Sequence, residues 1–332
     1  MTIAKQWVLA SRPVGTPTME NFRLEQVELP DLAEGQILVE NTVNTVDPYM
    51  RGRMNDVKSY IPPFELDKPM TGGAVGVVRE SRSEKFQVGD AVSHSLGWQD
   101  IAIVDEGQAK PVDLNVAPAA AYLGILGLTG LTAYVGLTRI AEIKEGDVVF
   151  VSGAAGAVGS AVGQFARHLG ASRVIGSAGS EEKIARLKEL GFDAAINYRE
   201  GDLAGQLHQA APEGIDVYFD NVGGEHLEAA LGRMNTFGRV ALCGAIAQYN
   251  DTQQPSAPRN LALAIGKCLT LRGFVLGQYL DVAPEFRERM APLIASGEIQ
   301  YDVTTRHGIE AMPEAFLELF TGGNTGKMVV EM

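Results

Sequence analysis

A glycine-rich turn, Gly-Ala-Ala-Gly-Ala-Val-Gly-Ser at residues 153–160, is the segment whose residue types and spacing most clearly predict chemistry. An apolar run, Val148–Ser152, precedes it, and a stretch of helical periodicity, Gly159–Leu169, follows it. Glycines permit a tight strand-to-helix turn and let a pyrophosphate reach the backbone, and the positive end of the helix attracts the anion. The first position of the G-x-G-x-x-G pattern is Ala154, and similar turns recur in many α/β proteins. The flanking strand and helix nevertheless favour a dinucleotide site.

The next predicted strand indicates which dinucleotide binds. NAD sites usually place Asp or Glu about 20 residues beyond the glycines, where the carboxylate binds the ribose hydroxyls. Here the strand Arg173–Ser177 leads into Gly-Ser-Ala-Gly-Ser at 176–180 and ends without an acid. Lys183 lies one turn into the following helix and Tyr198 ends the next strand, so both are placed to receive a 2′-phosphate. The alternative is that Lys183 is an ordinary solvated lysine, but the missing acid favours NADPH.

Residues that could bind a metal are few and widely spaced. The five histidines are scattered, and the chain contains no CxxC or HExxH spacing. The two cysteines, Cys243 and Cys268, lie in apolar segments and are expected to be small buried hydrophobes. We therefore predict no metal site. A hydride acceptor that needs no Lewis acid is a carbon–carbon double bond conjugated to a carbonyl, because a tyrosine or ribose hydroxyl can stabilise the resulting enolate oxygen.

The elements that must position these residues change in character near Leu123. The first third is β-rich and contains a long loop, Asn55–Met70, that we expect to be functional. Beyond Leu123, strand and helix patterns alternate, which predicts βαβ units and a parallel sheet covered on both faces. The strands predicted after the glycine turn are Arg173–Ser177, Ala194–Tyr198, Ile215–Val222 and Arg239–Ala245, with Leu269–Val275 as a candidate sixth. The tail, with strands at Gln300–Thr305 and Lys327–Glu331, breaks this rhythm and is expected to return to the N-terminal domain.

Length and composition limit the function classes. At 332 residues the chain accommodates two domains, and 45% hydrophobic with 21% charged residues is ordinary for a globular protein. The net charge of −13 and the lack of a dense Lys/Arg tract argue against nucleic acid and anionic membranes as partners. No run reaches the roughly 20 apolar residues of a membrane helix, and the N-terminus lacks a signal-peptide pattern, so we expect a cytoplasmic protein.

Eight short motifs, in one order along the whole chain, resemble a known family. They are Trp7-Val-Leu-Ala-Ser-Arg-Pro, Asp47-Pro-Tyr-Met-Arg-Gly-Arg-Met, Gly97-Trp-Gln-Asp, Gly130-Leu-Thr-Ala-Tyr, Ala154-Ala-Gly-Ala-Val-Gly, Asp220-Asn-Val-Gly-Gly, Cys243-Gly-Ala-Ile and Gly322-Gly-Asn-Thr-Gly-Lys. The family is the zinc-independent medium-chain dehydrogenase/reductases, in the branch of prostaglandin reductases, leukotriene hydroxydehydrogenases and alkenal reductases. The chain looks most like bacterial curcumin-reductase-type members. It departs from many relatives at Gly127-Leu-Thr-Gly, where they have Gly-Met-Pro-Gly, so substrate preference does not follow from the resemblance.

The resemblance implies an α/β fold in which a doubly wound parallel Rossmann domain for NADPH/NADP, residues 125–297, is inserted into a GroES-like β-rich catalytic domain, residues 1–124 and 298–332. It implies NADPH-dependent reduction of the carbon–carbon double bond of α,β-unsaturated ketones or aldehydes, and a homodimer. Two alternatives share every cofactor signal: a quinone reductase of the same superfamily, and a catalytically weak NADPH-binding sensor.

The resemblance also assigns roles to individual residues. Tyr249 is the expected catalytic residue that stabilises the enolate, with the cofactor ribose hydroxyl as the alternative. Tyr60 and Tyr49 are the expected substrate contacts. The expected cofactor contacts are Thr132, Gly156, Ala157, Val158, Gly159, Ser160, Lys183, Tyr198, Asn221, Cys243, Gly244, Ala245, Ile246, Phe274, Val275, Leu276 and Asn324.

The segment Asp47-Pro48-Tyr49 also has a structural interpretation. Asp47 is expected to cap a turn that Pro48 starts, while Tyr49 packs against it. Arg51 and Arg53 follow closely and are expected to be solvated or salt-bridged. Their alternative role is to bind an acidic tail of a substrate.

Overall fold

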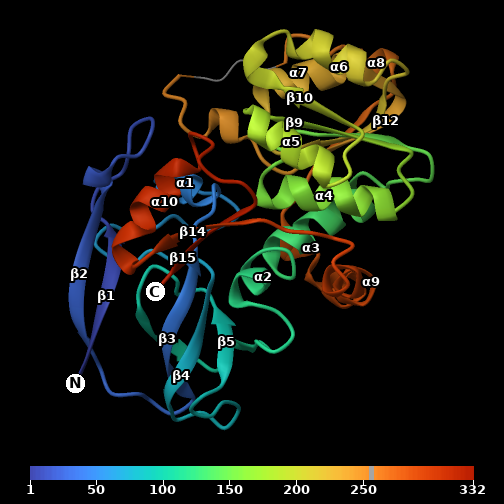
Figure 1. Cartoon of the computed structure of the whole chain (residues 1–332). Coiled ribbons are helices and arrows are strands. Elements are labelled where there is room, and N and C mark those ends of the chain that lie inside the picture. The colour runs from blue at the N-terminus through green and yellow to red at the C-terminus, as the bar shows by residue number, and fades with distance from the viewer. Residues whose placement is uncertain (254–257) are drawn as a thin grey trace. The chain divides into compact units, whose positions relative to one another are not determined.

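The computed structural model describes residues 1–253 and 258–332 and divides the chain into two compact units (Figure 1). Unit 1 comprises Met1–Gly124 with Val303–Met332, and unit 2 comprises Ile125–Asp302. Each unit contains its own main β-sheet, with seven strands in unit 1 and six in unit 2.

The second boundary between the units lies later than the sequence predicts. The prediction places it between residues 297 and 298, whereas unit 2 ends at Asp302 and unit 1 resumes at Val303. The side chain of Gln164, in helix α4 (Ala157–His168), bonds the main chain of Gln300 twice. It donates to the Gln300 carbonyl and accepts from the Gln300 N–H, both at 2.8 Å. These two bonds keep the segment before Asp302 in unit 2.

Unit 2 is built around a sheet in which every neighbouring pair of strands is parallel, as the alternating pattern predicts. The strand order is β10-β9-β8-β11-β12-β13, so the direction of progression along the sheet reverses between β8 and β11. In a doubly wound sheet, ligands bind at the carboxyl ends of the strands where this reversal occurs. The strands are β8 Val148–Val151, β9 Arg173–Ala178, β10 Ala194–Asn197, β11 Ile215–Asp220, β12 Met234–Leu242 and β13 Thr270–Gly273.

Helices cover both faces of this sheet. Ile175 and Gly176 are adjacent in β9 and therefore point to opposite faces. Ile175 packs in a buried cluster with Leu207 of α6 and Ala230 of α7. On the opposite face, a Cβ at Gly176 would lie 2.7 Å from the Cβ of Ala154, so the turn before α4 closely approaches β9. The helices are α3 Leu128–Val135, α4 Ala157–His168, α5 Glu181–Glu189, α6 Leu203–Ala210, α7 Gly224–Arg233, α8 Leu263–Gly266 and α9 Ala283–Ala295.

Unit 1 consists mainly of antiparallel strands. Strands β1 and β2 form a ribbon, while the larger sheet runs β14-β15-β3-β4-β5-β7, with β6 also paired to β3. Strand β15 pairs with β3, so the C-terminal tail completes a sheet begun near the N-terminus. The elements are β1 Thr2–Leu9, β2 Phe22–Leu29, β3 Gln36–Thr45, α1 Met50–Arg53, β4 Ala74–Ser81, β5 Ala91–His94, β6 Ile101–Asp105, β7 Lys110–Pro111, α2 Ala119–Leu123, β14 Val303–His307, α10 Met312–Glu318 and β15 Lys327–Glu331.

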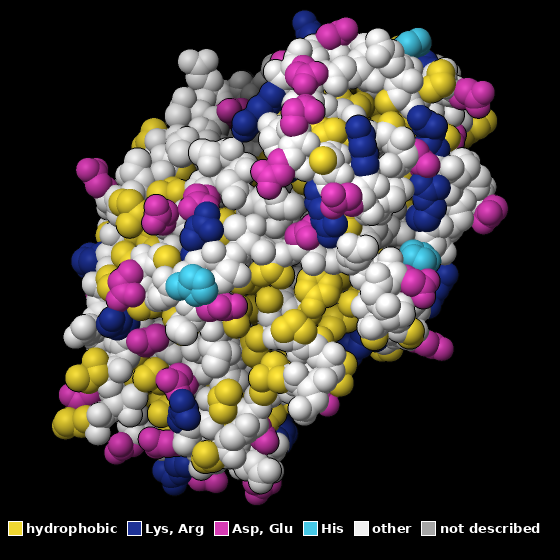
Figure 2. Space-filling model, in the orientation of Figure 1, with side chains coloured by type: hydrophobic (Ala, Val, Ile, Leu, Met, Phe, Trp, Pro, Cys, Tyr) yellow, Lys and Arg dark blue, Asp and Glu magenta, His cyan; other side chains and the backbone are white. Residues whose placement is uncertain are grey.

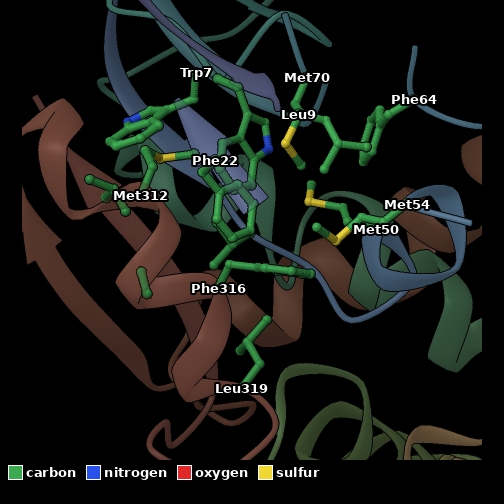
Figure 3. Close-up of a cluster of buried hydrophobic side chains, with 14 of the residues drawn as sticks. Trp7, Leu9, Phe22, Met50, Met54, Phe64, Met70, Met312, Phe316 and Leu319 are labelled. Atoms are coloured by element: carbon green, nitrogen blue, oxygen red, sulfur yellow. The ribbon is translucent and has the colours of Figure 1, made fainter. Parts of the chain in front are cut away.

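A buried cluster of aromatic and sulfur-containing side chains forms a core of unit 1 (Figure 3). Trp98 is fully buried and stacks on Phe22 with ring centroids 5.9 Å apart, and Phe316 of α10 meets Trp98 edge-on at 6.1 Å. The indole N–H of Trp7 donates to the carbonyl of Ile309 at 2.7 Å. The core joins β1 and β2 to the C-terminal helix, which gives the two tryptophan-containing motifs a structural explanation.

Charged side chains of both signs lie interspersed on the face shown in Figure 2. Lys and Arg lie among Asp and Glu there and form no continuous basic tract. Within residues 1–253 and 258–332, no helix is long and apolar enough to cross a membrane.

The two cysteines occupy different environments. Cys243 is half-buried, but Cys268 is exposed and adopts a φ of +52°. The prediction that both are buried is wrong for Cys268, because the chain turns at the surface after α8 before β13 begins at Thr270. A burial prediction from an apolar segment fails where that segment contains a turn.

Candidate active site

A buried carboxylate ties the ends of β8 and β11 together at the switch point of the sheet. Asp220 accepts hydrogen bonds from the Tyr218 hydroxyl at 2.6 Å, the Ser152 hydroxyl at 3.1 Å and the Gly223 N–H at 2.8 Å. Asn221 adds a bond from its side-chain amide to the Ser152 carbonyl at 2.8 Å. Burial raises the pKa of Tyr218 well above its usual value, so the phenol stays neutral and keeps donating. The network fixes the chain at the ends of β8 and β11, where the dinucleotide site is predicted.

The glycine turn has the conformation that an anion cradle requires. Gly153 adopts a φ of +60°, a left-handed conformation that glycine adopts more easily than residues with a side chain. A Cβ at Gly159 would collide with the Gly153 carbonyl, so helix α4 approaches the turn as closely as the backbone permits. The N-cap of α4 is Gly156, which has no side chain to cap the first N–H groups, beginning with Ala157. These N–H groups and the helix dipole suit a pyrophosphate.

Two cations meet just beyond the end of β9, where residues 177–180 include no acid and Glu181 and Glu182 lie in the first turn of α5. A Cβ at Gly179 would lie 2.7 Å from the Tyr198 hydroxyl and 3.1 Å from Arg199 Nε, so all three residues are adjacent. Ser180 caps α5 by accepting the N–H of Lys183 at 3.3 Å, which places the lysine in the first turn. Burial, and next the charge of Arg199, lower the pKa of Lys183. Like charges gathered beside a helix N-terminus favour an anion there.

Arg199 is the residue of this end that the sequence prediction missed. The signal for Arg199 was its position directly after Tyr198, which the prediction included. Ser177 lies near the end of β9, and its buried hydroxyl has no hydrogen-bond partner among the described residues. His226 packs edge-on against the Tyr198 ring at 5.1 Å, and burial lowers its pKa to about 4. The imidazole is therefore neutral and leaves the positive charge here to Lys183 and Arg199.

The turn 243–246 after β12 positions Tyr249. The N–H groups of Cys243 and Gly244 donate to the Asp220 carbonyl at 2.9 and 3.0 Å, which anchors the turn to β11. The N–H of Ala245 then donates to the Tyr249 hydroxyl at 3.3 Å. A Cβ at Gly244 would lie 3.3 Å from the same hydroxyl, so glycine leaves room for the phenol. The structure thus brings the predicted catalytic tyrosine onto the predicted cofactor turn.

The structure shows the neighbours of three further residues of unit 2 that are predicted to contact the cofactor. Thr132 donates its hydroxyl to the Leu128 carbonyl at 2.7 Å within α3. Phe274 follows β13 and packs edge-on against Phe219 with ring centroids 6.4 Å apart. Burial raises the pKa of the Cys243 thiol to about 12, so this cysteine stays protonated beside the cofactor turn.

The predicted substrate tyrosines belong to unit 1. Tyr60 lies in the loop after α1 and is 64% exposed. Tyr49 is half-buried and has a pKa raised by burial and then by Asp47, while the charge of Arg53 opposes the rise. The remaining predicted cofactor contact of unit 1, Asn324, donates its side-chain amide to the Gly326 carbonyl at 2.8 Å.

Asp47 forms a buried ion pair rather than the predicted cap. Its carboxylate accepts hydrogen bonds from the ammonium of Lys327, at the start of β15, and from the Thr45 hydroxyl at 3.2 Å. Asp47 and Lys327 are only 8% and 4% exposed. The side-chain cap was a wrong prediction, because the partner that takes the carboxylate lies far along the chain. The pair joins the segment that bears Tyr49 to the segment that follows Asn324.

Side chains that bind metals do not gather at one place in the described structure. Residues 1–253 and 258–332 include no group of three or more His, Cys, Asp or Glu arranged to hold a metal ion. His168 of α4 and His208 of α6 are exposed.

Two family models match the sequence: an N-terminal domain of oxidoreductase over residues 5–112, and a zinc-binding dehydrogenase over residues 157–296. The NADPH-dependent curcumin reductase of Escherichia coli is 40% identical over 334 residues, which cover 99% of this chain and 96% of that protein. The NADP(+)-dependent 2-alkenal reductase of Nicotiana tabacum is 42% identical and covers 98% of this chain and 96% of its own.

A solved structure extends the comparison to three dimensions. CurA from Vibrio vulnificus in complex with NADPH matches with a TM-score of 0.94 and 43% identity, covering 99% of each chain. The doubly wound sheet and the β-rich unit are therefore the two parts of a known two-domain fold, a Rossmann domain with a GroES-like domain. The chain belongs to the medium-chain dehydrogenase/reductase family, in the branch that includes the curcumin, 2-alkenal and prostaglandin reductases.

Proposed function

We propose that this chain reduces the carbon–carbon double bond of α,β-unsaturated ketones or aldehydes with NADPH as the hydride donor. The observation that carries the proposal is the pair of cations, Lys183 and Arg199, beside Tyr198 just beyond the end of β9, where residues 177–180 include no acid. The pair favours a coenzyme that bears a 2′-phosphate. Relatives that match the chain from end to end are named as NADPH-dependent or NADP(+)-dependent reductases.

The residues of unit 2 fit such a coenzyme. The uncapped first turn of α4, at 157–160, would hold the pyrophosphate, because only glycine fits at position 159. Lys183, Arg199 and Tyr198 would hold the 2′-phosphate. Proposed contacts on the remaining path are Thr132, Asn221, Cys243, Gly244, Ala245, Ile246, Phe274, Val275 and Leu276, with Asn324 of unit 1 as a further contact.

The proposed reaction adds a hydride and a proton across the double bond. Bound NADPH supplies the hydride, which adds to the β-carbon of the substrate. The π electrons move toward the carbonyl oxygen, and the Tyr249 hydroxyl donates a hydrogen bond to the enolate oxygen that forms. The Ala245 N–H donates to the same hydroxyl at 3.3 Å and holds the phenol in place. Water then protonates the α-carbon. Tyr49 and Tyr60 are the proposed substrate contacts.

Replacing Tyr249 with phenylalanine is expected to lower kcat about 10²-fold, the usual effect of removing one donor to an oxyanion. The Kd for NADPH should stay unchanged, since the ring and its packing remain. Steady-state kinetics with an enone and a fluorescence titration with NADPH measure the two effects. Tyr122→Phe is the control, because its hydroxyl bonds the Asp113 carbonyl at 2.7 Å in a different part of the chain. Wild-type turnover in Tyr249→Phe would remove the assigned role.

A homodimer is the proposed assembly, with the β13 edge of the six-stranded sheet as its interface. β13 is the last strand of that sheet, and Thr270 and Gly273 are exposed. Phe237, 72% exposed, and Ile265, 83% exposed, lie in the segments that precede this strand. An unpaired edge flanked by apolar side chains favours pairing with another chain. Light scattering should give twice the mass of one chain for the wild type and a shift toward monomer for Arg272→Pro. A wild-type mass of one chain would exclude the dimer.

A further inference from the structure

One arginine contacts the loop after α1 in several ways. Arg53, the last residue of α1, donates from Nε to the Pro62 carbonyl at 2.9 Å and from Nη1 to the Thr71 hydroxyl at 2.7 Å. Its guanidinium lies 4.0 Å from the centre of the Phe64 ring. Its own carbonyl accepts the Phe64 N–H at 2.7 Å. The guanidinium of Arg53 also interacts electrostatically with Tyr49.

The two halves of this loop are held differently. The second half is attached to β1, because Asp67 N–H donates to the Leu9 carbonyl and Met70 N–H to the Trp7 carbonyl, both at 3.0 Å. Phe64 belongs to the same buried core and is 3% exposed (Figure 3). The first half, from 57 to 60, is exposed throughout. The Arg53 bond to Pro62 lies at the junction between these halves.

The contacts of Arg53 require a guanidinium. The planar fork bonds a carbonyl and a hydroxyl in two directions while its face stacks on an aromatic ring. A lysine ammonium is a single point and cannot make the same set of contacts. Burial lowers the pKa of Arg53, which indicates that the group is partly withdrawn from water for these bonds. Within residues 1–253 and 258–332 Arg53 forms no ion pair and its guanidinium contacts a carbonyl, a hydroxyl and a ring, so the prediction of a solvated or salt-bridged arginine is wrong for Arg53.

We propose that Arg53 is a positioning residue that fixes the Tyr60 loop against α1, and thereby determines how well bulky α,β-unsaturated substrates bind. This inference rests on the proposed function, in which Tyr60 and Tyr49 contact the substrate. Arg53 is related to both tyrosines, since it interacts electrostatically with Tyr49 and its Nε donates to the carbonyl of Pro62, two residues beyond Tyr60. The KM for a small enone that does not reach these phenols should not depend on the position of the loop.

The kinetic test compares a small and a bulky enone, 3-buten-2-one and 1,3-diphenylpropenone. In Arg53→Met, the KM for the bulky enone should rise about tenfold, the effect of losing about one charge-assisted hydrogen bond. The kcat for both substrates and the KM for the small enone should stay unchanged. Arg53→Lys should behave like Arg53→Met, because the fork is lost while the charge remains. Equal losses on both substrates, or full rescue by lysine, would overturn the proposal.

Two additional variants keep the test interpretable if Arg53→Met folds poorly. Thr71→Ala removes one partner of the guanidinium and should give a smaller effect in the same direction, about threefold on the bulky enone. Arg82→Met is the matched control, since its guanidinium bonds the Leu32 carbonyl at 2.9 Å elsewhere in unit 1. It should leave both substrates unaffected.

Limited proteolysis tests, without any substrate, whether Arg53 fixes the loop against α1. Lys58 lies in the exposed half of the loop, so trypsin can cut after it when the loop moves away from α1. Cleavage at Lys58, followed by mass spectrometry, should be about tenfold faster in Arg53→Met than in wild type or Arg82→Met. Unchanged cleavage contradicts the positioning role. If the wild type reduces no enone but cleavage accelerates, the proposed function fails while the role of Arg53 in the loop stands.

Discussion

Replacing Lys183 and Arg199 together with alanine is expected to raise the KM for NADPH by about 10²- to 10³-fold while leaving the KM for NADH nearly unchanged. A hydrogen bond to a charged group contributes about 1.5–3 kcal/mol, and two such bonds at a partly exposed site fall at the lower end of the sum. NADH lacks the 2′-phosphate, so the KM for NADH should change little. Initial rates with both coenzymes and one enone measure the change.

The control for this experiment removes the same charge elsewhere. Lys188→Ala with Arg287→Ala changes two exposed cations of unit 2, one of them on the same helix as Lys183. This control should leave both KM values near wild type. An equal loss for NADPH and NADH in the Lys183/Arg199 variant would mean that the two cations do not recognise a 2′-phosphate.

Replacing Lys327 with methionine is expected to destabilise unit 1 by about 3–5 kcal/mol, because the Asp47 carboxylate is left buried without its partner. Replacing both members, with Asp47→Leu and Lys327→Met, should recover most of this loss, since a buried ion pair and well-packed apolar side chains are often of similar stability. The single and double variants together separate the cost of an orphan charge from the net contribution of the pair.

Tryptophan fluorescence during urea unfolding measures this effect in the correct unit. Both tryptophans of the chain, Trp7 and Trp98, lie in the buried core of unit 1. Lys5→Met is a control that removes a surface lysine of unit 1, which bonds Glu310 at 2.7 Å, and it should lower the stability far less than Lys327→Met does. A Lys327→Met variant as stable as the wild type would show that the ion pair contributes little. A double variant as unstable as the single would show that the orphan charge is not the cause.

Local sequence patterns predicted the fold of unit 2 well because its strands and helices alternate regularly. The alternating strands and helices after Leu123 gave the parallel sheet, and the glycine turn lies at the start of α4 as predicted. Lys183 and Tyr198 lie together at the end of β9 for the same reason: parallel strands bring their carboxyl ends to one edge of a sheet. Arg199 was missed because sequence spacing alone does not say which side chains of a strand end turn toward the next strand.

The contacts of unit 1 were less predictable because they join distant parts of the chain. The side chain of Asp47 was assigned to a local turn, but its partner is Lys327, 280 residues away. The segment containing Arg53 indicated a solvated arginine, whereas the folded loop supplies a carbonyl, a hydroxyl and a ring around it. Cys268 shows the converse error, in which an apolar neighbourhood in the sequence becomes an exposed turn.

The most direct test of the proposed function is to follow NADPH oxidation by its absorbance with purified protein and a panel of enones, alkenals and quinones, with NADH in parallel. We expect the absorbance to fall with NADPH and an enone or alkenal, and to change far less with NADH. Preference for NADH would contradict the assignment of Lys183 and Arg199, and turnover of quinones alone would indicate the quinone reductase instead. If NADPH binds but its absorbance falls with none of the acceptors, the result would contradict the reductase and favour a coenzyme sensor.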